Sequence, residues 1–237
     1  MSSFVDKYYD DLADVKTKLV EKVNRLLPRL ETLSDSELIE LSRSLDFFEE
    51  AKRLGYDKIA KDFERGLSKE VADTLKKAGT FGVDIAGVNL ESLQLIMDLE
   101  LDSLVSQNRE LSKQLKKEVF RGLLTGESIN EISTRIETEF SGNARITQSR
   151  VATGDAVSKL FRTTTQKAFE GDEEQRFKYV GPDDNKTREI CKSVLGNSQN
   201  NKGFTFAEIE ALAPIDGKKV TFTDGGSYNC RHEFVPV

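Results

Sequence analysis

The sequence predicts a mainly helical α+β protein, in which a body of long helices that includes a basic helix precedes a small C-terminal α+β module. Apolar residues recur at steps of three and four over the first half, the spacing of helices with one buried face. Four prolines in 237 residues leave room for long helices. After Gly171, turn-forming residues become frequent and β-branched and aromatic residues come in short runs. We therefore divide the chain into a helical body, residues 1–124, and a module, residues 125–237, helical over 125–170 and α+β over 171–237.

The first helices are marked by an apolar stripe and by capping signals. Pro28 lies inside the stripe and predicts a kink or break near Arg25–Leu27, because proline lacks a backbone donor and clashes with the preceding turn. Ser34–Glu37 has the spacing of a capping box, so a second helix should begin there and end at Gly55. A third helix is expected over Asp57–Ala78. The stripe of the first helix consists of Val5, Tyr8, Leu12, Val15, Leu19, Val23, Leu26, Leu30 and Leu33.

A long helix is predicted over residues 89–124, after a loop over residues 80–89. Its apolar positions form a nearly heptad seam that includes Asn108, and a polar seam residue can fix the register between helices. The seam predicts a helix buried in its own domain, and self-association through residues 89–124 is the alternative. The apolar members of the seam are Leu90, Leu93, Met97, Leu101, Leu104, Leu111, Leu115 and Val119.

A short helix is expected from Ser128 to Phe140, because Ser128–Glu131 again has capping-box spacing. A basic helix should follow over residues 144–170. Since the whole chain has a net charge of −6, this helix is the one plausible basic face. Contact with DNA is its functional interpretation, and a solvated or protein-docking face is the alternative. The basic residues of this face are Arg145, Arg150, Lys159, Arg162 and Lys167.

The tail carries signals of short strands and one short helix. Gln175–Val180 alternates as a strand would, and Lys219–Thr223 and Glu233–Val237 are further strand candidates. Thr205 has capping-box spacing and predicts a helix over Phe206–Leu212. The tail is therefore expected to be a small α+β module.

Composition excludes several classes of protein. No apolar run approaches the roughly 18 residues of a membrane span, so no membrane partner is expected. The N-terminus lacks the basic start and apolar core of a secretory signal. Two cysteines cannot form a disulfide framework, which favours a reducing cytoplasm. The acidic net charge argues against a general nucleic-acid coat protein.

The residues best suited to chemistry gather in two short stretches of the tail. Gly181–Cys191 and Gly225–His232 contain both cysteines and the only histidine. Tetrahedral zinc accepts such a set of ligands, although the sequence has no Cys-x-x-Cys pair. The ligands of a zinc site would be Cys191, Cys230 and His232, with either Asp183 or Asp184.

Two other interpretations of these stretches compete with zinc. A nucleophilic Cys191 activated by His232 would need an orienting third group, which the sequence does not single out. We favour a structural role, in which the cysteines are small buried side chains and Asp183 caps the turn around Asn185 or pairs with Arg231. Under this interpretation no catalytic residue, no metal and no cofactor is expected.

The two stretches also carry motifs in a fixed order after an aromatic strand. Gly-Pro-x-Asp and Thr-Arg-x-x-Cys lie within Gly181–Cys191, and Gly225–Gly226 precedes Asn229–His232. This ordered set resembles the phage head morphogenesis family, the Mu F-like minor head proteins, over roughly residues 115–237. The basic helix departs from the family pattern at Gly154–Asp155, where threonine followed by glutamate is common.

The resemblance implies a non-enzymatic minor head (minor capsid) protein of a tailed phage or prophage. Such a protein would associate with the portal protein or the major capsid protein during head assembly, and would influence DNA packaging or ejection, with packaged DNA as a further partner. It would lie in the virion, in the capsid interior or at the portal vertex, and in the host cytoplasm during assembly. The basic helix would then contact DNA or the portal. The structural motif implied by the resemblance consists of Asp183, Thr187, Arg188, Cys191, Asn229, Cys230, Arg231 and His232.

Overall fold

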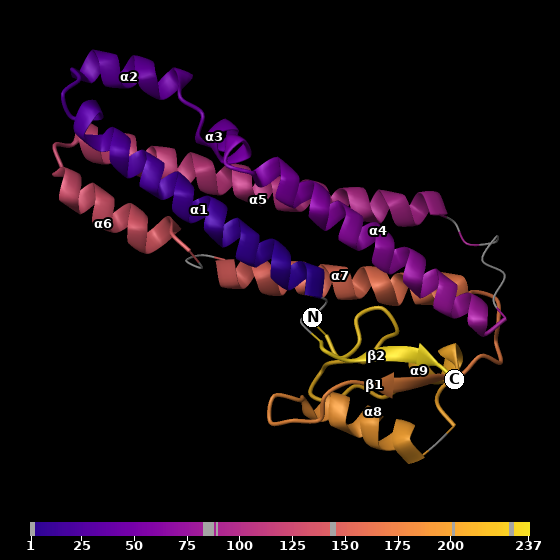
Figure 1. Cartoon of the computed structure of the whole chain (residues 1–237). Helices are drawn as coiled ribbons and strands as arrows, with labels where there is room; N and C mark the ends of the chain where they lie inside the picture. Colours follow the sequence, from indigo (N-terminus) through magenta and orange to yellow (C-terminus); the bar gives the residue numbers. More distant parts are fainter. Residues whose placement is uncertain (1–2, 83–87, 89, 143–145, 201, 228–229) are drawn as a thin grey trace. The chain divides into compact units, whose positions relative to one another are not determined.

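The computed structural model describes residues 3–82, 88, 90–142, 146–200, 202–227 and 230–237 (Figure 1). Its helices and its two-stranded antiparallel sheet confirm the mainly helical α+β class. Among the described residues, no helix is both long enough and apolar enough to span a bilayer.

The contacts divide the chain into two compact units, each of which is discontinuous in sequence. The helical unit contains Ser2–Arg65 and Leu101–Arg150. The mixed unit contains Gly66–Glu100 and Val151–Val237. This division runs through three helices, at Arg65–Gly66, Glu100–Leu101 and Arg150–Val151, and does not coincide with the boundary predicted after residue 124.

The order of the elements follows the sequence prediction in most places. The strands β1 (Phe177–Val180) and β2 (Glu233–Pro236) lie in two of the segments predicted as strands, and they pair antiparallel with Tyr179 opposite Phe234. The helices are α1 (Ser3–Leu30), α2 (Asp35–Ser44), α3 (Phe47–Arg53), α4 (Tyr56–Thr80), α5 (Leu90–Leu124), α6 (Ile129–Phe140), α7 (Ile146–Ala168), α8 (Glu189–Asn200) and α9 (Phe206–Glu210).

The apolar stripe of α1 forms the core of the helical unit. Most of its members are buried, and α1 packs against α3 and α6 (Figure 1). The ring of Phe63 in α4 contacts those of Phe4 and Tyr8, with centroid distances of 5.3 and 4.9 Å. Contrary to the sequence prediction, the helix is not broken before Pro28: α1 continues to Leu30, and the proline, which donates no backbone hydrogen bond, lies two residues before its end.

Asn108 joins three helices inside the helical unit. Its amide nitrogen, which carries two hydrogens, lies within hydrogen-bond distance of three acceptors: the hydroxyl oxygens of Tyr8 (3.0 Å) and Tyr56 (3.2 Å) and the carbonyl oxygen of Leu104 (2.9 Å). Burial raises the pKa of Tyr8, so its hydroxyl stays protonated. This part of the α5 seam is therefore buried within the chain. Leu90, by contrast, is 57% exposed and does not belong to the buried seam.

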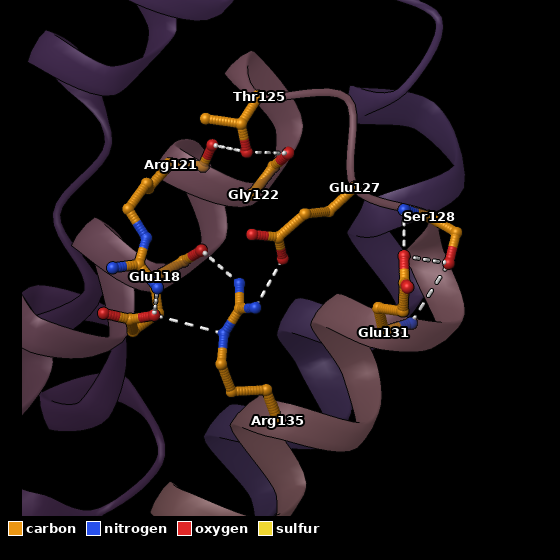
Figure 2. Close-up of polar contacts among 8 residues, drawn as sticks. All are labelled: Glu118, Arg121, Gly122, Thr125, Glu127, Ser128, Glu131 and Arg135. Carbon is orange, nitrogen blue, oxygen red and sulfur yellow. Dashed lines mark hydrogen bonds and ion pairs between the residues drawn. The ribbon is translucent and has the colours of Figure 1, made fainter.

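Capping boxes begin three helices at the predicted residues. In each, the side chain of the cap accepts a hydrogen bond from a backbone N–H three residues later, and the glutamate there accepts from the cap. Figure 2 shows one such box beside Arg135 of α6, which pairs with Glu118 of α5 (3.1 Å) and with Glu127. These ion pairs hold the start of α6 against the end of α5. The three boxes are Ser34 with Glu37, Ser128 with Glu131, and Thr205 with Glu208.

The single helix expected over residues 34–55 is interrupted. α2 ends at Ser44, and Asp46 begins α3 by accepting hydrogen bonds from the backbone N–H groups of Phe48 (2.8 Å) and Glu49 (3.3 Å). Aspartate is a preferred N-cap residue, because its carboxylate satisfies donors that have no partner within the helix. The prediction of one helix is therefore wrong, and Asp46 is the local signal of the interruption.

Lys219–Thr223 does not form a strand. Backbone hydrogen bonds instead close two tight turns, one over Ile215–Lys218 and one over Thr221–Gly225. Asp216–Gly217 has φ angles of 52° and 71°, a conformation that an Asp-Gly pair adopts readily. The strand prediction is wrong because the chain turns back on itself on both sides of Val220.

An aromatic cluster around β1 forms the core of the mixed unit. Phe177 is fully buried, and the two-residue period of the strand puts Tyr179 on the same face. α8 packs against β1. The ring of Phe177 contacts those of Phe169, Phe206 and Phe222, at centroid distances of 5.4, 4.7 and 4.9 Å.

Candidate functional site

The mixed unit brings together four side chains that could take part in acid–base chemistry or bind a metal. Tyr179 comes from β1, Cys191 from the first turn of α8, and Cys230 and His232 from the segment that leads into β2. Each of the four is at most 5% exposed. We call these four residues the thiol–imidazole cluster.

The two sulfur atoms and the imidazole lie within direct contact distance. The Sγ atoms of Cys191 and Cys230 are 3.9 Å apart, and the Sγ atom of Cys230 is 3.6 Å from Nδ1 of His232. The hydroxyl oxygen of Tyr179 is 3.6 Å from the sulfur of Cys191 and 3.4 Å from that of Cys230. The sequence did not single out Tyr179, although the alternation of β1 places it on the buried face.

A backbone carbonyl fixes the tautomer of His232. The Nε2 atom of His232 lies 2.8 Å from the carbonyl oxygen of Pro182, and because a carbonyl only accepts, Nε2 carries the hydrogen. In the neutral ring, Nδ1 then has a free lone pair, which faces Cys230. The imidazole also stacks on the ring of Tyr179, at a centroid distance of 5.2 Å and an interplanar angle of 15°.

Glycine lets the backbone approach the sulfur atoms closely. The N–H group of Gly226 donates to the Sγ atom of Cys230 (3.0 Å). A Cβ atom on Gly226 would lie 2.2 Å from the sulfur of Cys191, far inside contact distance. Arg188 donates to the carbonyl oxygen of Gly226 (2.9 Å) and so holds this glycine in place.

These contacts shift the pKa values of the two thiols in opposite directions. The hydrogen bond from Cys191 lowers the pKa of Cys230, and the donors of Tyr179 and Gly226 act in the same direction against burial. The same hydrogen bond, together with burial, raises the pKa of Cys191. Burial raises the pKa of the Tyr179 hydroxyl as well. Of the two thiols, Cys230 is therefore the one whose surroundings favour the thiolate form, with the Cys191 sulfur and the Tyr179 hydroxyl within hydrogen-bond distance of its sulfur.

The loop before α8 is organised by Thr187 and Asp184. The hydroxyl of Thr187 donates to the carbonyl oxygen of Pro182 (2.8 Å) and accepts from the N–H group of Asp184 (3.0 Å). The two carboxylate oxygens of Asp184 accept from the guanidinium of Arg231, at 2.8 and 2.6 Å. Asp184, and not Asp183, is thus the partner of Arg231, and neither carboxylate lies in the thiol–imidazole cluster as a fourth ligand.

The exposure of this ion pair predicts a small effect on stability. The side chains of Arg231 and Asp184 are 39% and 41% exposed, and exposed pairs contribute little because water and salt screen them. Arg231→Ala should therefore lower the free energy of unfolding only slightly at pH 7, measured by urea denaturation.

The same pair gives a pH dependence with a defined sign. The Arg231 guanidinium holds the pKa of Asp184 well below its ordinary value of 3.8. The pair's contribution is present above that ordinary value and is lost as the pH falls through the lowered pKa. The difference between wild type and Arg231→Ala should shrink when denaturation is repeated at increasingly acidic pH. A large difference at neutral pH that persists in acid would contradict this account.

The basic face expected on α7 is largely neutralised. Arg150 pairs with Asp6, Lys159 with Asp224 (2.7 Å) and Lys167 with Glu170 (3.0 Å). Binding to a phosphate backbone needs net positive charge, and these pairs leave little of it on the described residues of α7. Arg145 and Asn229, which the sequence placed in the basic face and in the structural motif, lie outside the described residues.

Arg162 is buried, which contradicts its expected place on that surface. It is 3% exposed, and its guanidinium donates to the carbonyl oxygens of Thr223 (3.1 Å) and Cys230 (2.7 Å). α7 is buried on several sides, so an arginine in its middle points inward and serves two backbone acceptors. Arg162 therefore fixes the backbone that presents Cys230.

Similarity to known proteins does not identify the chain. No protein-family model, no curated protein and no solved structure matches it. The resemblance to the phage head morphogenesis family remains a prediction from the motifs of the tail.

Proposed function

We propose that this chain is a non-enzymatic minor head protein of a tailed phage or prophage, which associates with the portal protein or the inner capsid surface during head assembly. The observation that carries the proposal is the meeting of the two motif stretches. Cys191 in the first stretch and Cys230 and His232 in the second form one buried cluster. A family motif whose residues also converge in space is stronger support for the resemblance than the same motif in the sequence alone.

Burial of the sulfur atoms supports a non-enzymatic role. A catalytic cysteine needs a partly exposed thiolate that a substrate can approach. Cys191 and Cys230 are 2% and 5% exposed, and glycine backbone and aromatic rings surround them. The cluster is therefore suited to holding the tail together and poorly suited to attacking a substrate.

An exposed pair of leucines on α5 supports docking to another protein. Leu95 and Leu99 are 60% and 59% exposed, and their spacing of four residues puts them on one face of the helix. Large apolar side chains that share an exposed face are typical of interaction surfaces. In this proposal the pair contacts the portal or capsid protein.

Co-purification with a portal protein tests the proposal. We expect the chain to be found in purified particles or procapsids by mass spectrometry, and to be captured with the portal protein of the same phage or prophage. The variant with Leu95→Asp and Leu99→Asp should fold normally but lose portal capture. Ile39→Asp, at an exposed apolar position of α2, is the matched control and should retain capture. Absence of the chain from particles and procapsids would contradict the proposal.

A further inference from the structure

The thiol–imidazole cluster has the ligand chemistry of a zinc site. Two cysteine sulfurs and one imidazole nitrogen form a common part of structural zinc sites, and thiolate with imidazole favours zinc over magnesium or calcium. The candidate ligand atoms of Cys191, Cys230 and His232 all lie within 4.8 Å of one another. The three residues come from segments that are 39 residues apart in the chain, so the fold, and not a local motif, assembles them.

Two of the three distances between these atoms match the edges of a zinc tetrahedron. With Zn–S near 2.3 Å and Zn–N near 2.0–2.1 Å, a tetrahedral ion separates two sulfurs by about 3.8 Å and a sulfur from a nitrogen by about 3.6 Å. The observed separations are 3.9 Å between the sulfurs and 3.6 Å between Cys230 Sγ and His232 Nδ1. Both measured edges therefore have the length that a shared ion would impose.

The hydroxyl of Tyr179 lies at the distance of a further zinc ligand from both sulfurs. Its distances to the sulfurs of Cys191 and Cys230, 3.6 and 3.4 Å, are close to the edge of about 3.5 Å expected between a sulfur and an oxygen ligand of zinc. Neither Asp183 nor Asp184 supplies a further ligand, because Asp183 is exposed and Asp184 is held by Arg231.

The surroundings of the cluster are those of a metal site. A histidine ligand usually donates its other N–H to a carbonyl or carboxylate, as His232 does to the carbonyl oxygen of Pro182. The Gly226 N–H group donates to the Cys230 sulfur, and Arg162 holds the Cys230 carbonyl. These outer contacts orient both ligands before any ion binds.

We propose that Cys191, Cys230 and His232 bind one structural Zn²⁺ ion, with the Tyr179 hydroxyl closing the fourth position. The ion would tie β1, α8 and the start of β2 together. Each of the two strands has only four residues, and a two-stranded pair of that size is marginal without a further link. The zinc proposal uses the same cluster as the proposed function but does not depend on a role in head assembly.

Metal analysis of the purified full chain tests the proposal without any variant. We expect one zinc ion per chain after growth with zinc, and its removal by a chelator should abolish the protease resistance of residues 171–237. Replacement by Co²⁺ should give the sulfur-to-metal charge-transfer band and the strong visible bands of a tetrahedral thiolate site. A chain that binds neither zinc nor cobalt, or that is isolated under native conditions with a Cys191–Cys230 disulfide, overturns the proposal.

Variants then assign the ligands. Cys191→Ser, Cys230→Ser and His232→Ala should each lose the bound zinc, and the two serine variants should weaken the charge-transfer band. Val194→Ala is the matched control, because Val194 is also buried on α8, one turn beyond Cys191, and carries no ligand atom. Loss of zinc from the control as readily as from the ligand variants would show a general loss of folding, and would contradict the assignment. Tyr179→Phe should keep zinc but alter the cobalt spectrum, and an unchanged spectrum would exclude its hydroxyl as a ligand.

Discussion

Leu104→Asp is expected to cost the helical unit about 3–5 kcal/mol, the cost of an uncompensated buried charge. Leu104 is 3% exposed on α5, and its carbonyl oxygen accepts from the Asn108 amide that also reaches Tyr8 and Tyr56. A carboxylate there must be desolvated without a cation beside it, and it displaces the apolar packing around the amide. Urea denaturation followed by circular dichroism measures the loss.

Leu99→Asp provides the comparison on the same helix. Leu99 is 59% exposed, so its replacement should change the free energy of unfolding by no more than about 0.5 kcal/mol. Equal denaturation midpoints for the Leu104 and Leu99 variants would show that the α5 seam is solvated, contrary to the structure.

Arg162→Ala is expected to destabilise the mixed unit by roughly 2–6 kcal/mol. The change removes donors from two carbonyl oxygens, those of Thr223 and Cys230, and each unsatisfied buried acceptor costs about 1–3 kcal/mol. Limited proteolysis of residues 171–237, combined with urea denaturation, locates the loss in this unit.

Two further substitutions on α7 separate geometry from charge. Arg162→Lys keeps the positive charge but cannot span two acceptors with a planar fork, so its stability should lie between those of the wild type and the alanine variant. Lys167→Ala removes an exposed charge from the same helix and should be nearly neutral. If Arg162→Ala were as mild as Lys167→Ala, the guanidinium would contribute no more than a surface charge.

Local signals explain why much of the fold could be predicted. A capping box needs only residues three apart, so Ser34, Ser128 and Thr205 mark helix starts whatever surrounds them. The alternation that predicts β1 is equally local. Asp46 and Asp216 carry local signals too. The signal of Asp46 competes with the apolar pattern of the helix expected over residues 34–55, and the signal of Asp216 competes with the β-branched run in Lys219–Thr223. α8 was not predicted, because its few apolar residues give too short a pattern.

Long-range contacts explain why the site could be predicted only in part. The sequence collects both cysteines and the histidine, because they lie in two short stretches. It cannot show that His232 faces Cys230, that Tyr179 joins them, or that Arg162 turns inward, since each depends on segments brought together by the fold. Our proposal of a zinc site rests on these long-range contacts, whereas the sequence alone favoured a purely structural role for the cysteines.

The discontinuity of the two units sets the order in which they can form during synthesis. The helical unit needs Leu101–Arg150 and is complete in sequence once Arg150 has left the ribosome. Gly66–Glu100 emerges earlier but belongs to the mixed unit, and its partners in Val151–Val237 are made last. The apolar residues of that early segment stay exposed until the end of the chain has been made. Their contacts then join residues far apart in the sequence, and such contacts form slowly. A truncated chain that ends near residue 150 would therefore expose Gly66–Glu100 permanently and should aggregate, whereas one that begins at residue 125 would lack part of its own core.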